Sequence, residues 1–228
     1  MQHLAIIPDG NRRWAKKNKL RSFFGHKKGM DTFKVASEFC LKNSIRYLSI
    51  YTFSLENFNR SDDEKKYLFE LLINQAKNEL QDFVKNGIRV RFIGNKKYFP
   101  EHVLKAVEVL ESKTKHLDKL NLNLLFCYGS KNEITHAVKE LAKRVKAGVL
   151  AVEEINEESI SNYLWTAGMP NPDLIIRTSG ICRLSNFLLY QAAYSEFMFL
   201  DCHWPEITSA HLQKCYDNFK NIKRNFGE

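Results

Sequence analysis

The sequence lacks any run of about 20 apolar residues, the length that a membrane-spanning helix requires. Its first residues lead directly into a short apolar run, without the basic region and longer apolar segment of a signal peptide. These absences argue against an integral membrane protein and against a secreted one. We therefore expect a cytoplasmic protein that meets a membrane only peripherally, at its inner face.

Cysteine and histidine are too scattered to form a disulfide framework or a zinc site. The five Cys are odd in number and include no C-x-x-C pair, and the seven His include no H-E-x-x-H motif. We interpret the cysteines as free thiols that mostly fill the core.

Domain boundaries are also absent from the sequence. It has no low-complexity segment, no repeat of fixed period and no linker rich in Pro, Gly and Ser. Its 228 residues, 44% of them hydrophobic, suffice for one domain with a sizeable core. We predict a single domain over residues 1–228.

Positive charge is what the sequence has in excess. It holds 35 Lys and Arg against 26 Asp and Glu, which gives a formal net charge of +9. Such an excess favours anionic partners, which are nucleic acid, a lipid surface or phosphorylated small molecules. Charge alone does not choose among these three.

Apolar runs alternate with segments of helical spacing along the chain. Strands are predicted over residues 4–7, 45–53, 88–93, 122–127, 174–177 and 197–200. One long helix is predicted from the cap at Ser61 through Phe83, a second from Pro100 through Leu117, and a third that ends at Gly148. This alternation predicts an α/β fold with a mostly parallel central sheet flanked by helices on both faces.

The loop after the first predicted strand combines an acidic residue with groups that bind anions. Asp9 is followed by Gly10 and Asn11, and then by Arg12 and Arg13. Because a carboxylate repels phosphate, this combination indicates a Mg²⁺ ion that bridges the carboxylate and diphosphate oxygens. The alternative for these residues alone is a helix N-cap at Asp9 beside two solvent-exposed arginines.

Two further loops add polar groups at the same predicted edge of the sheet, where ligands of parallel sheets bind. Ser54, Asn57 and Arg60 follow the second strand; alone they also fit a polar loop and a helix cap. Arg177 and Arg183, among hydroxyl residues and a glycine, follow the fifth strand and resemble an anion cradle, or a pair of surface salt bridges. Together the three loops hold enough cationic groups for two diphosphates.

Five motifs, in order and at similar spacing, resemble the cis-prenyltransferase family, most closely its bacterial undecaprenyl diphosphate synthases. They extend over nearly the whole chain. The motifs are H-L-A-I-I-P-D-G-N-R-R-W-A-K-K from His3, G-H-K-K-G from Gly25, F-S-L-E-N-F-N-R from Phe53, D-L-I-I-R-T-S-G with R-L-S-N-F-L-L from Asp173, and A-A-Y-S-E-F from Ala192 followed by Trp204-Pro205.

The resemblance implies a role for each matching residue. Asp9 matches the catalytic aspartate that holds Mg²⁺ and assists diphosphate departure, Asn57 matches the proposed proton acceptor, and Glu196 matches a second metal ligand that acts across a homodimer. The residues implied to bind the substrates are Gly10, Asn11, Arg12, Arg13, Trp14, Arg21, His26, Ser54, Leu55, Glu56, Phe58, Arg60, Arg177, Arg183, Leu184 and Ser185.

The sequence departs from the family pattern at several positions. Arg12 stands where the family often has Gly, and Arg21 lies five residues before His26 instead of four. Ser179 replaces a commoner Gly. Residues 224–227 match an arginine-rich tail only in part, so we assign the tail no contribution to the site of a partner subunit.

The reaction implied by the resemblance is cis-prenyl chain elongation. Farnesyl diphosphate is the implied primer, and isopentenyl diphosphate units are added to give undecaprenyl diphosphate, the precursor of the lipid carrier for cell-wall glycans. The implied cofactor is Mg²⁺ and the implied assembly is a homodimer. An apolar product and a positive net charge further indicate transient association with a membrane surface.

The growing chain needs a dry tunnel, which two predicted helices could line. The candidates are Leu68, Phe69, Leu71, Leu72, Val103, Val107 and Leu110, of which we expect only a subset to face a tunnel and the rest to fill the core.

Three other functions compete with this one: a synthase of different product length, a catalytically silent partner subunit, and a nucleic-acid-binding protein. Sequence motifs do not exclude the first, because product length depends on tunnel geometry. A silent subunit has no need of Asp9, Asn57, Arg177, Arg183 and Glu196 together. Since no nucleic-acid-binding module is recognisable, we predict that the protein binds no nucleic acid.

Overall fold

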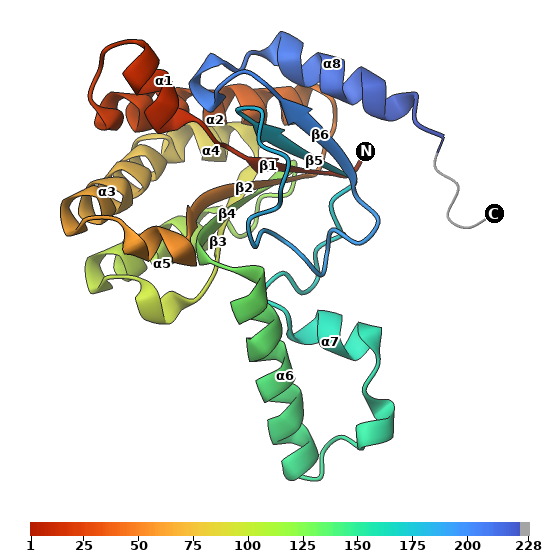
Figure 1. Cartoon of the computed structure of the whole chain (residues 1–228). Helices are drawn as coiled ribbons and strands as arrows, with labels where there is room; N and C mark the ends of the chain where they lie inside the picture. Colours follow the sequence, from red (N-terminus) through yellow and green to blue (C-terminus); the bar gives the residue numbers. More distant parts are fainter. Residues whose placement is uncertain (224–228) are drawn as a thin grey trace.

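Six parallel strands form one sheet at the centre of the computed structural model, which describes residues 1–223. The strand order is β3-β4-β2-β1-β5-β6, and every neighbouring pair is parallel (Figure 1). The strands are β1 (His3–Ile7), β2 (Tyr47–Ser54), β3 (Ile88–Ile93), β4 (Leu120–Tyr128), β5 (Leu174–Thr178) and β6 (Glu196–Leu200). The predicted α/β fold class and all six predicted strands are confirmed.

The α-helices of the described chain lie between and after these strands. They are α1 (Asn11–Lys17), α2 (Ser22–Lys42), α3 (Asp62–Asn78), α4 (Leu80–Asn86), α5 (Glu101–Thr114), α6 (Ser130–Lys146), α7 (Glu157–Tyr163) and α8 (Ser209–Lys220). Ser61 caps α3 as predicted, and Gly148, with a φ of 68°, follows the end of α6.

Two predicted helices are shorter than expected. The single long helix predicted through Phe83 is wrong, because the chain breaks at Glu79 into α3 and α4. Beyond the break, Leu80 and Phe83 of α4 still pack against the larger core. Helix α5 ends at Thr114, whose hydroxyl donates to the carbonyl oxygen of Leu110, and Leu117 lies beyond that end.

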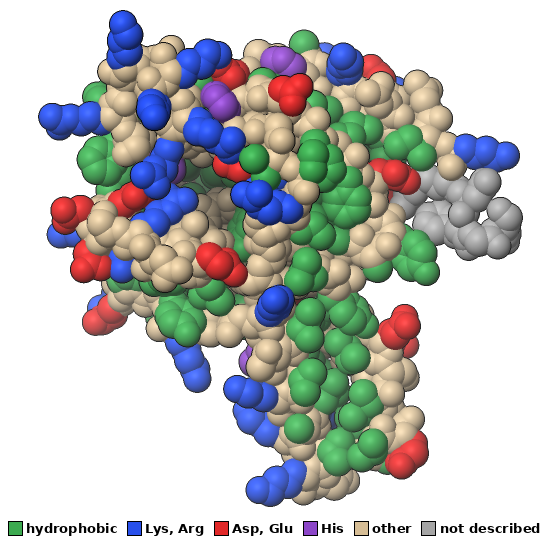
Figure 2. All heavy atoms as spheres, viewed as in Figure 1, with side chains coloured by type: hydrophobic (Ala, Val, Ile, Leu, Met, Phe, Trp, Pro, Cys, Tyr) green, Lys and Arg blue, Asp and Glu red, His purple; other side chains and the backbone are tan. Residues whose placement is uncertain are grey.

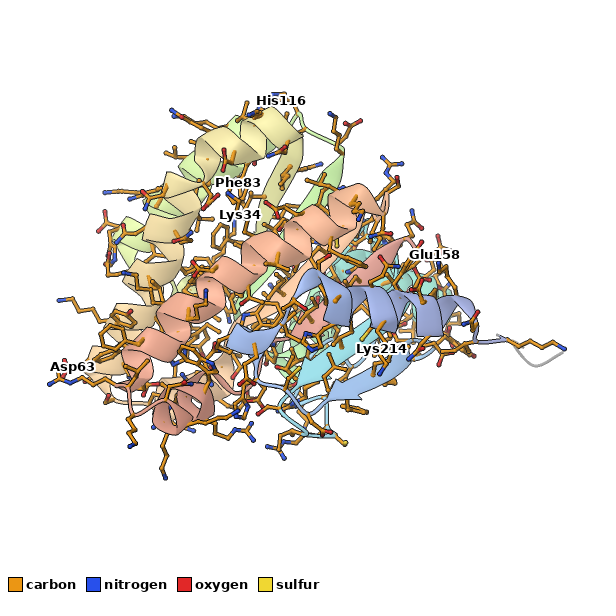
Figure 3. The ribbon with its side chains drawn as sticks, turned by 90° about the horizontal axis from the view of Figure 1, so that it is seen from above. Lys34, Asp63, Phe83, His116, Glu158 and Lys214 are labelled. Carbon is orange, nitrogen blue, oxygen red and sulfur yellow. The ribbon has the colours of Figure 1, made fainter. Side chains whose placement is uncertain are left out.

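The helices cover the two faces of the sheet unequally. The larger core takes side chains from α2, α3, α5 and α8 on one face of the sheet. In Figure 3, which views the molecule from above, α2 and α8 lie in front of the strands. The opposite face is covered mainly by the non-helical residues 184–192 and by Trp165 and Met169. The expectation of helices on both faces therefore holds fully for one face only.

Helices α6 and α7 project away from the sheet as an arm (Figure 1). A fully buried carboxylate, that of Glu133, ties the base of this arm to the body. It accepts hydrogen bonds from the Thr166 backbone N–H and hydroxyl, each at 3.1 Å, from Gln191 Nε2 at 3.0 Å and from the Tyr128 hydroxyl. A buried polar group needs hydrogen-bond partners of this kind.

The strand order places a crevice of the kind that binds ligands beside β1. The chain reaches β2 from β1 across the larger core, and reaches β5 from β4 across the opposite face, so that β1 lies where the strand order reverses. Crevices for ligands form at such points, beyond the carboxyl ends of the strands. Among residues 1–223, none of the helices combines the length and the apolar character needed to cross a bilayer.

Candidate active site

A cavity of about 580 Å³ opens beyond the carboxyl ends of β1, β2 and β5. Figure 2 shows the molecule hollowed on this side, with Lys and Arg side chains around the opening. Nine residues predicted from the sequence line it: Asp9, Asn11, His26, Ser54, Glu56, Asn57, Arg60, Arg177 and Ser185. The fold therefore brings all three predicted loops to one place.

Asp9 lies between two arginines at the base of this cavity. Its Oδ2 accepts a hydrogen bond from Arg177 Nη2 at 2.9 Å, and its Oδ1 lies 3.0 Å from Arg13 Nη2. Oδ1 also accepts from the Gly10 backbone N–H at 2.6 Å. Partial burial raises the pKa of Asp9, but the hydrogen bonds from Arg177 and Arg13 outweigh it and hold that pKa below its usual value. Asp9 is thus an ionised carboxylate at neutral pH.

Arg177 is the next-to-last residue of the neighbouring strand β5, and only 5% of it is exposed. Its Nη1 donates to Ser185 Oγ at 2.8 Å and to the backbone carbonyl of Arg183, whose own Nε lies 3.3 Å from Ser185 Oγ. Its Nε is buried and has no hydrogen-bond partner among residues 1–223. A buried guanidinium N–H without a protein partner can donate to a bound anion.

The turn at Gly10 is fixed by close contacts from β5 and from the segment after β6. Gly10 has a φ of 98°, and a methyl group added there would lie 2.7 Å from both Ser179 Oγ and His203 Nδ1. Those two atoms are hydrogen-bonded to each other at 2.8 Å. The Thr178 hydroxyl donates to the Asp9 carbonyl at 2.7 Å. Position 10 therefore requires glycine for its backbone conformation and for its lack of a side chain.

On the other side of Asp9, His26 lies in a cationic environment. Burial first, and then the nearby Arg60 charge, lower the pKa of His26 to about 4, although Glu64 opposes this shift. His26 Nε2 is buried without a hydrogen-bond partner and lies 3.7 Å from Glu64 Oε1, which also pairs with Arg60 Nη1 at 3.0 Å. His26 is therefore neutral at pH 7, beside the charged Arg60 and Arg12.

The loop after β2 is organised by its own side chains. Asn57 Oδ1 accepts from the Ser54 backbone N–H at 3.1 Å and so caps the 3₁₀ turn Leu55–Asn59. Phe58 packs its ring edge-on against Phe53 at 5.2 Å between centroids. Glu56 Oε1 accepts from Asn186 Nδ2 at 2.8 Å, which links this loop to the one after β5.

Several predicted site residues lie outside the cavity lining. Arg12 and Arg21 are exposed, Arg21 at the N-cap of α2, while Trp14 is partly buried and Leu184 packs against the smaller core. Glu196 begins β6, at the amino ends of the strands, so a single chain does not bring it to Asp9. Its predicted role across a dimer stays a prediction. The predicted tail, residues 224–227, lies outside the described residues.

Sequence reasoning missed other residues that build the site. The hydroxyl of Tyr51 donates to the carbonyl of Tyr128, and its ring lines the cavity. Trp204 is buried, lines the same cavity and donates from Nε1 to the Gly29 carbonyl at 2.8 Å. His203 contacts the Gly10 turn from 193 positions away in the chain, which no local sequence signal could reveal.

The apolar end of the cavity runs between α2 and α3. Leu68, Leu71 and Leu72 line it, whereas the other tunnel candidates, Phe69, Val103, Val107 and Leu110, are buried core residues outside the lining. A second, smaller cavity of about 130 Å³ shares Met30, Phe33 and Leu72 with the first. It continues toward α4, where Lys34 and Phe83 line it (both labelled in Figure 3).

The oxygen donors at the base of the cavity suit a hard cation. Asp9 supplies an ionised carboxylate, and Asn11 supplies an Oδ1 that is buried without a partner among the described residues. Residues 1–223 contain no group of three or more His, Cys, Asp or Glu side chains that could hold a metal ion. Mg²⁺ commonly binds through one or two protein carboxylates together with substrate phosphates, and this donor set fits that mode.

Comparisons with known proteins agree with the motifs. The model of the family described as "Putative undecaprenyl diphosphate synthase" matches residues 7–227. The chain is 44% identical to an isoprenyl transferase of Clostridium perfringens, covering 99% of this chain and 89% of that one. It is 41% identical to a ditrans,polycis-undecaprenyl-diphosphate synthase of Micrococcus luteus, named as specific for (2E,6E)-farnesyl diphosphate, covering 99% and 91%.

A solved structure is also similar over the full length. It is the lavandulyl diphosphate synthase from Lavandula x intermedia in complex with dimethylallyl diphosphate. It superimposes with a TM-score of 0.96 at 31% identity and covers 100% of this chain and 98% of that one.

We predict that Gly10→Ala weakens the binding of inorganic pyrophosphate at least about tenfold, because the turn must move away from Ser179 and His203. Gly148→Ala is the matched control, since Gly148 has a φ of 68° but nothing within 4 Å of an added methyl group. Both variants should lose stability through the left-handed backbone. Titration calorimetry measures the pyrophosphate affinity of both variants. Equal affinity in the two would contradict the proposed role of the Gly10 turn.

Proposed function

Because the chain belongs to the undecaprenyl diphosphate synthase family of cis-prenyltransferases, we propose that it elongates farnesyl diphosphate with isopentenyl diphosphate to give undecaprenyl diphosphate. The name of the Micrococcus luteus relative supports this primer and this product. The family predicted from the sequence motifs is confirmed. The observation that carries the proposal is a pair of cationic subsites around Asp9 that opens into an apolar channel.

The two subsites suit two diphosphates. Arg177 and Ser185, with the Nε donor of Arg183 beside them, form the isopentenyl diphosphate subsite in this proposal. His26 and Arg60, on the opposite side of Asp9, form the subsite of the allylic diphosphate, whose apolar chain enters the channel between α2 and α3. Guanidinium groups bind phosphate oxygens through paired donors.

The chemistry follows from this arrangement. The bond between the allylic carbon and its diphosphate oxygen breaks, the isopentenyl double bond forms the new carbon–carbon bond, and a proton leaves the isopentenyl unit. Cationic side chains at the allylic subsite stabilise the negative charge that grows on the leaving diphosphate, a contribution of about 3–4 kcal/mol for each key donor. Mg²⁺, held by Asp9 and diphosphate oxygens, would neutralise part of the same charge.

Asn57 has a different role from that of a base. Its Oδ1 already accepts a hydrogen bond from the Ser54 N–H, and an amide has little basicity. Asn57 therefore positions the loop after β2 over the substrates. We propose that the proton passes to a diphosphate oxygen or to a water that this loop orients.

Product length is the finer part of the proposal. The similar structure is named a lavandulyl diphosphate synthase, so proteins that share this fold are named for different products. The channel favours elongation here, because the second cavity extends it past Leu72 toward α4 and gives a growing chain room. A synthase of different product length is the alternative.

We predict that labelled isopentenyl diphosphate, supplied with farnesyl diphosphate and Mg²⁺, is incorporated into a ladder of products that ends at the undecaprenyl length. Chelation of the metal should abolish incorporation. Asp9→Asn should lower turnover by at least about 100-fold, whereas Asp63→Asn, at an exposed acidic residue of α3 (labelled in Figure 3), should not. A folded Asp9→Asn protein with normal turnover would contradict the proposal. A ladder that ends at another chain length would change only the proposed product.

A homodimer is part of the proposed function. The edge strand β6 exposes Phe197 and Phe199 at 40% and 41%, and their rings stack 6.3 Å apart. The projecting arm exposes Val138 at 52% and Val149 at 60%. Figure 2 shows apolar side chains along the arm and the adjoining body. Apolar area of this kind marks a protein interface, and the family resemblance makes a second copy the proposed occupant.

Glu196 lies on the same edge strand, and we propose that it reaches the partner's Asp9 cavity.

Subunit complementation tests this arrangement. We predict that Asp9→Ala and Glu196→Gln homodimers are both weakly active, and that mixing them under exchange conditions restores activity, because one of the two sites in a mixed dimer keeps both carboxylates. Two Asp9→Ala preparations mixed with each other are the control. If mixing restores nothing although mass spectrometry detects mixed dimers, Glu196 does not act across the interface.

Product release is proposed to use a membrane surface. The product would be strongly apolar, and the formal charge of +9 favours a surface of anionic lipid. The labelled-substrate assay run with phosphatidylglycerol vesicles should show faster turnover than with neutral vesicles, and equal rates would remove this part of the proposal.

A further inference from the structure

A cavity larger than the Asp9 cavity lies away from it. It is a groove of about 810 Å³ between β3, the carboxyl-terminal part of α5 and one side of α6. It shares no lining residue with the Asp9 cavity. Neither the sequence motifs nor the proposed reaction gives it a role. We refer to it as the β3–α6 groove.

The charge of the β3–α6 groove is strongly positive. Seven Lys and Arg residues line it, against two glutamates. Both glutamates are already paired, Glu111 with Lys96 at 3.3 Å and Glu140 with Lys143 at 2.6 Å. Within residues 1–223 this leaves five lining cations without a salt bridge: Arg89, Arg91, Lys97, Lys115 and Lys139. Concave walls with one sign of charge concentrate counter-ions.

Two of these cations lie close together on one strand. Arg89 and Arg91 are two positions apart on β3, so they point to the same face of the sheet, and both are partly buried. Burial and the neighbouring Arg89 charge lower the pKa of the Arg91 guanidinium. Two like charges this close repel each other, and an anion bound between them would be attracted by both. Their register neighbours on β4, Asn121 and Asn123, are also polar, but both are buried and neither lines the groove.

An aromatic wall completes the β3–α6 groove. Trp165 and His136 both line it, with ring centroids 5.7 Å apart and an interplanar angle of 36°. Trp165 is partly exposed and offers a flat surface for stacking. The volume exceeds what a single phosphate fills and lies in the range of small-molecule sites.

The groove faces away from the apolar surface proposed for the dimer. Lys and Arg side chains line one side of the projecting α6 in Figure 2, and apolar side chains line its other side. Lys139 and Lys143 belong to the cationic side, whereas Val138 is exposed. A dimer formed through the apolar side therefore leaves the groove accessible.

We propose that the β3–α6 groove is a second anion-binding site, for a ligand that bears two or more phosphoryl charges on Arg89 and Arg91 and a planar ring against Trp165. A nucleotide has this chemistry. The phosphoryl headgroup of an anionic lipid is the other source of the same charge, although a concave groove fits a small molecule better than a flat bilayer.

The test uses ATP without added metal as the probe, with a farnesyl thiodiphosphate analogue present to occupy the Asp9 cavity. The variant is Arg89→Gln with Arg91→Gln, and the control is Lys42→Gln with Lys214→Gln, which removes two charges from exposed positions elsewhere (Lys214 is labelled in Figure 3). Titration calorimetry should show at least tenfold weaker ATP binding in the groove variant and less than a twofold change in the control. Prenyl transfer by both variants should equal that of the unaltered protein.

Two further arms identify the ligand. Trp165→Leu should weaken ATP but not inorganic pyrophosphate, if the ring stacks as proposed. Cosedimentation with phosphatidylglycerol vesicles that falls only in the groove variant, together with ATP binding that does not change, would assign the site to a lipid headgroup. The proposal is overturned if ATP, pyrophosphate and vesicles all bind the groove variant as they bind the control.

Discussion

The contact on which the site depends is the pairing of Asp9 with Arg177 across two neighbouring strands. Both residues lie at the carboxyl ends of their strands, and the register of β1 with β5 places Ile7 opposite Arg177, so the sheet itself sets their separation. Arg13 completes the cluster from α1. In this cluster the ionised carboxylate can face a cation while the guanidinium groups beside it face diphosphate oxygens. Neither the carboxylate nor the guanidinium groups could bind both ligands alone.

The unequal covering of the sheet explains why a channel can start at this cluster. Four helices pack on one face and leave an apolar slot between α2 and α3, while residues 184–192 close the other face and carry Ser185 and Asn186 to the mouth of the cavity. The polar and apolar ends of the cavity are thus built by different layers. An isoprenoid diphosphate has the same division between its two ends.

Much of this architecture could be predicted from sequence, for identifiable reasons. Buried parallel strands such as β1, whose residues 4–7 are all apolar, stand out in the sequence, and the loops that follow such strands must meet at one edge, so nine site residues could be placed together. The break at Glu79 could not be predicted, because the apolar spacing continues through Phe83 and only tertiary packing turns α4. His203 was missed because its contact with Gly10 depends on how β6 docks beside β5. Glu196 has no partner site within one chain, since β6 begins at the far end of the sheet.

The state of the Asp9 carboxylate gives the most direct test of this account. In protein labelled with ¹³C at the aspartate side chains, the NMR titration of Asp9 should give a pKa below that of an ordinary aspartate, and Arg177→Gln should raise that pKa while the exposed Arg144→Gln leaves it unchanged. An Asp9 pKa that does not respond to the loss of Arg177 would contradict the claim that this pair organises the site.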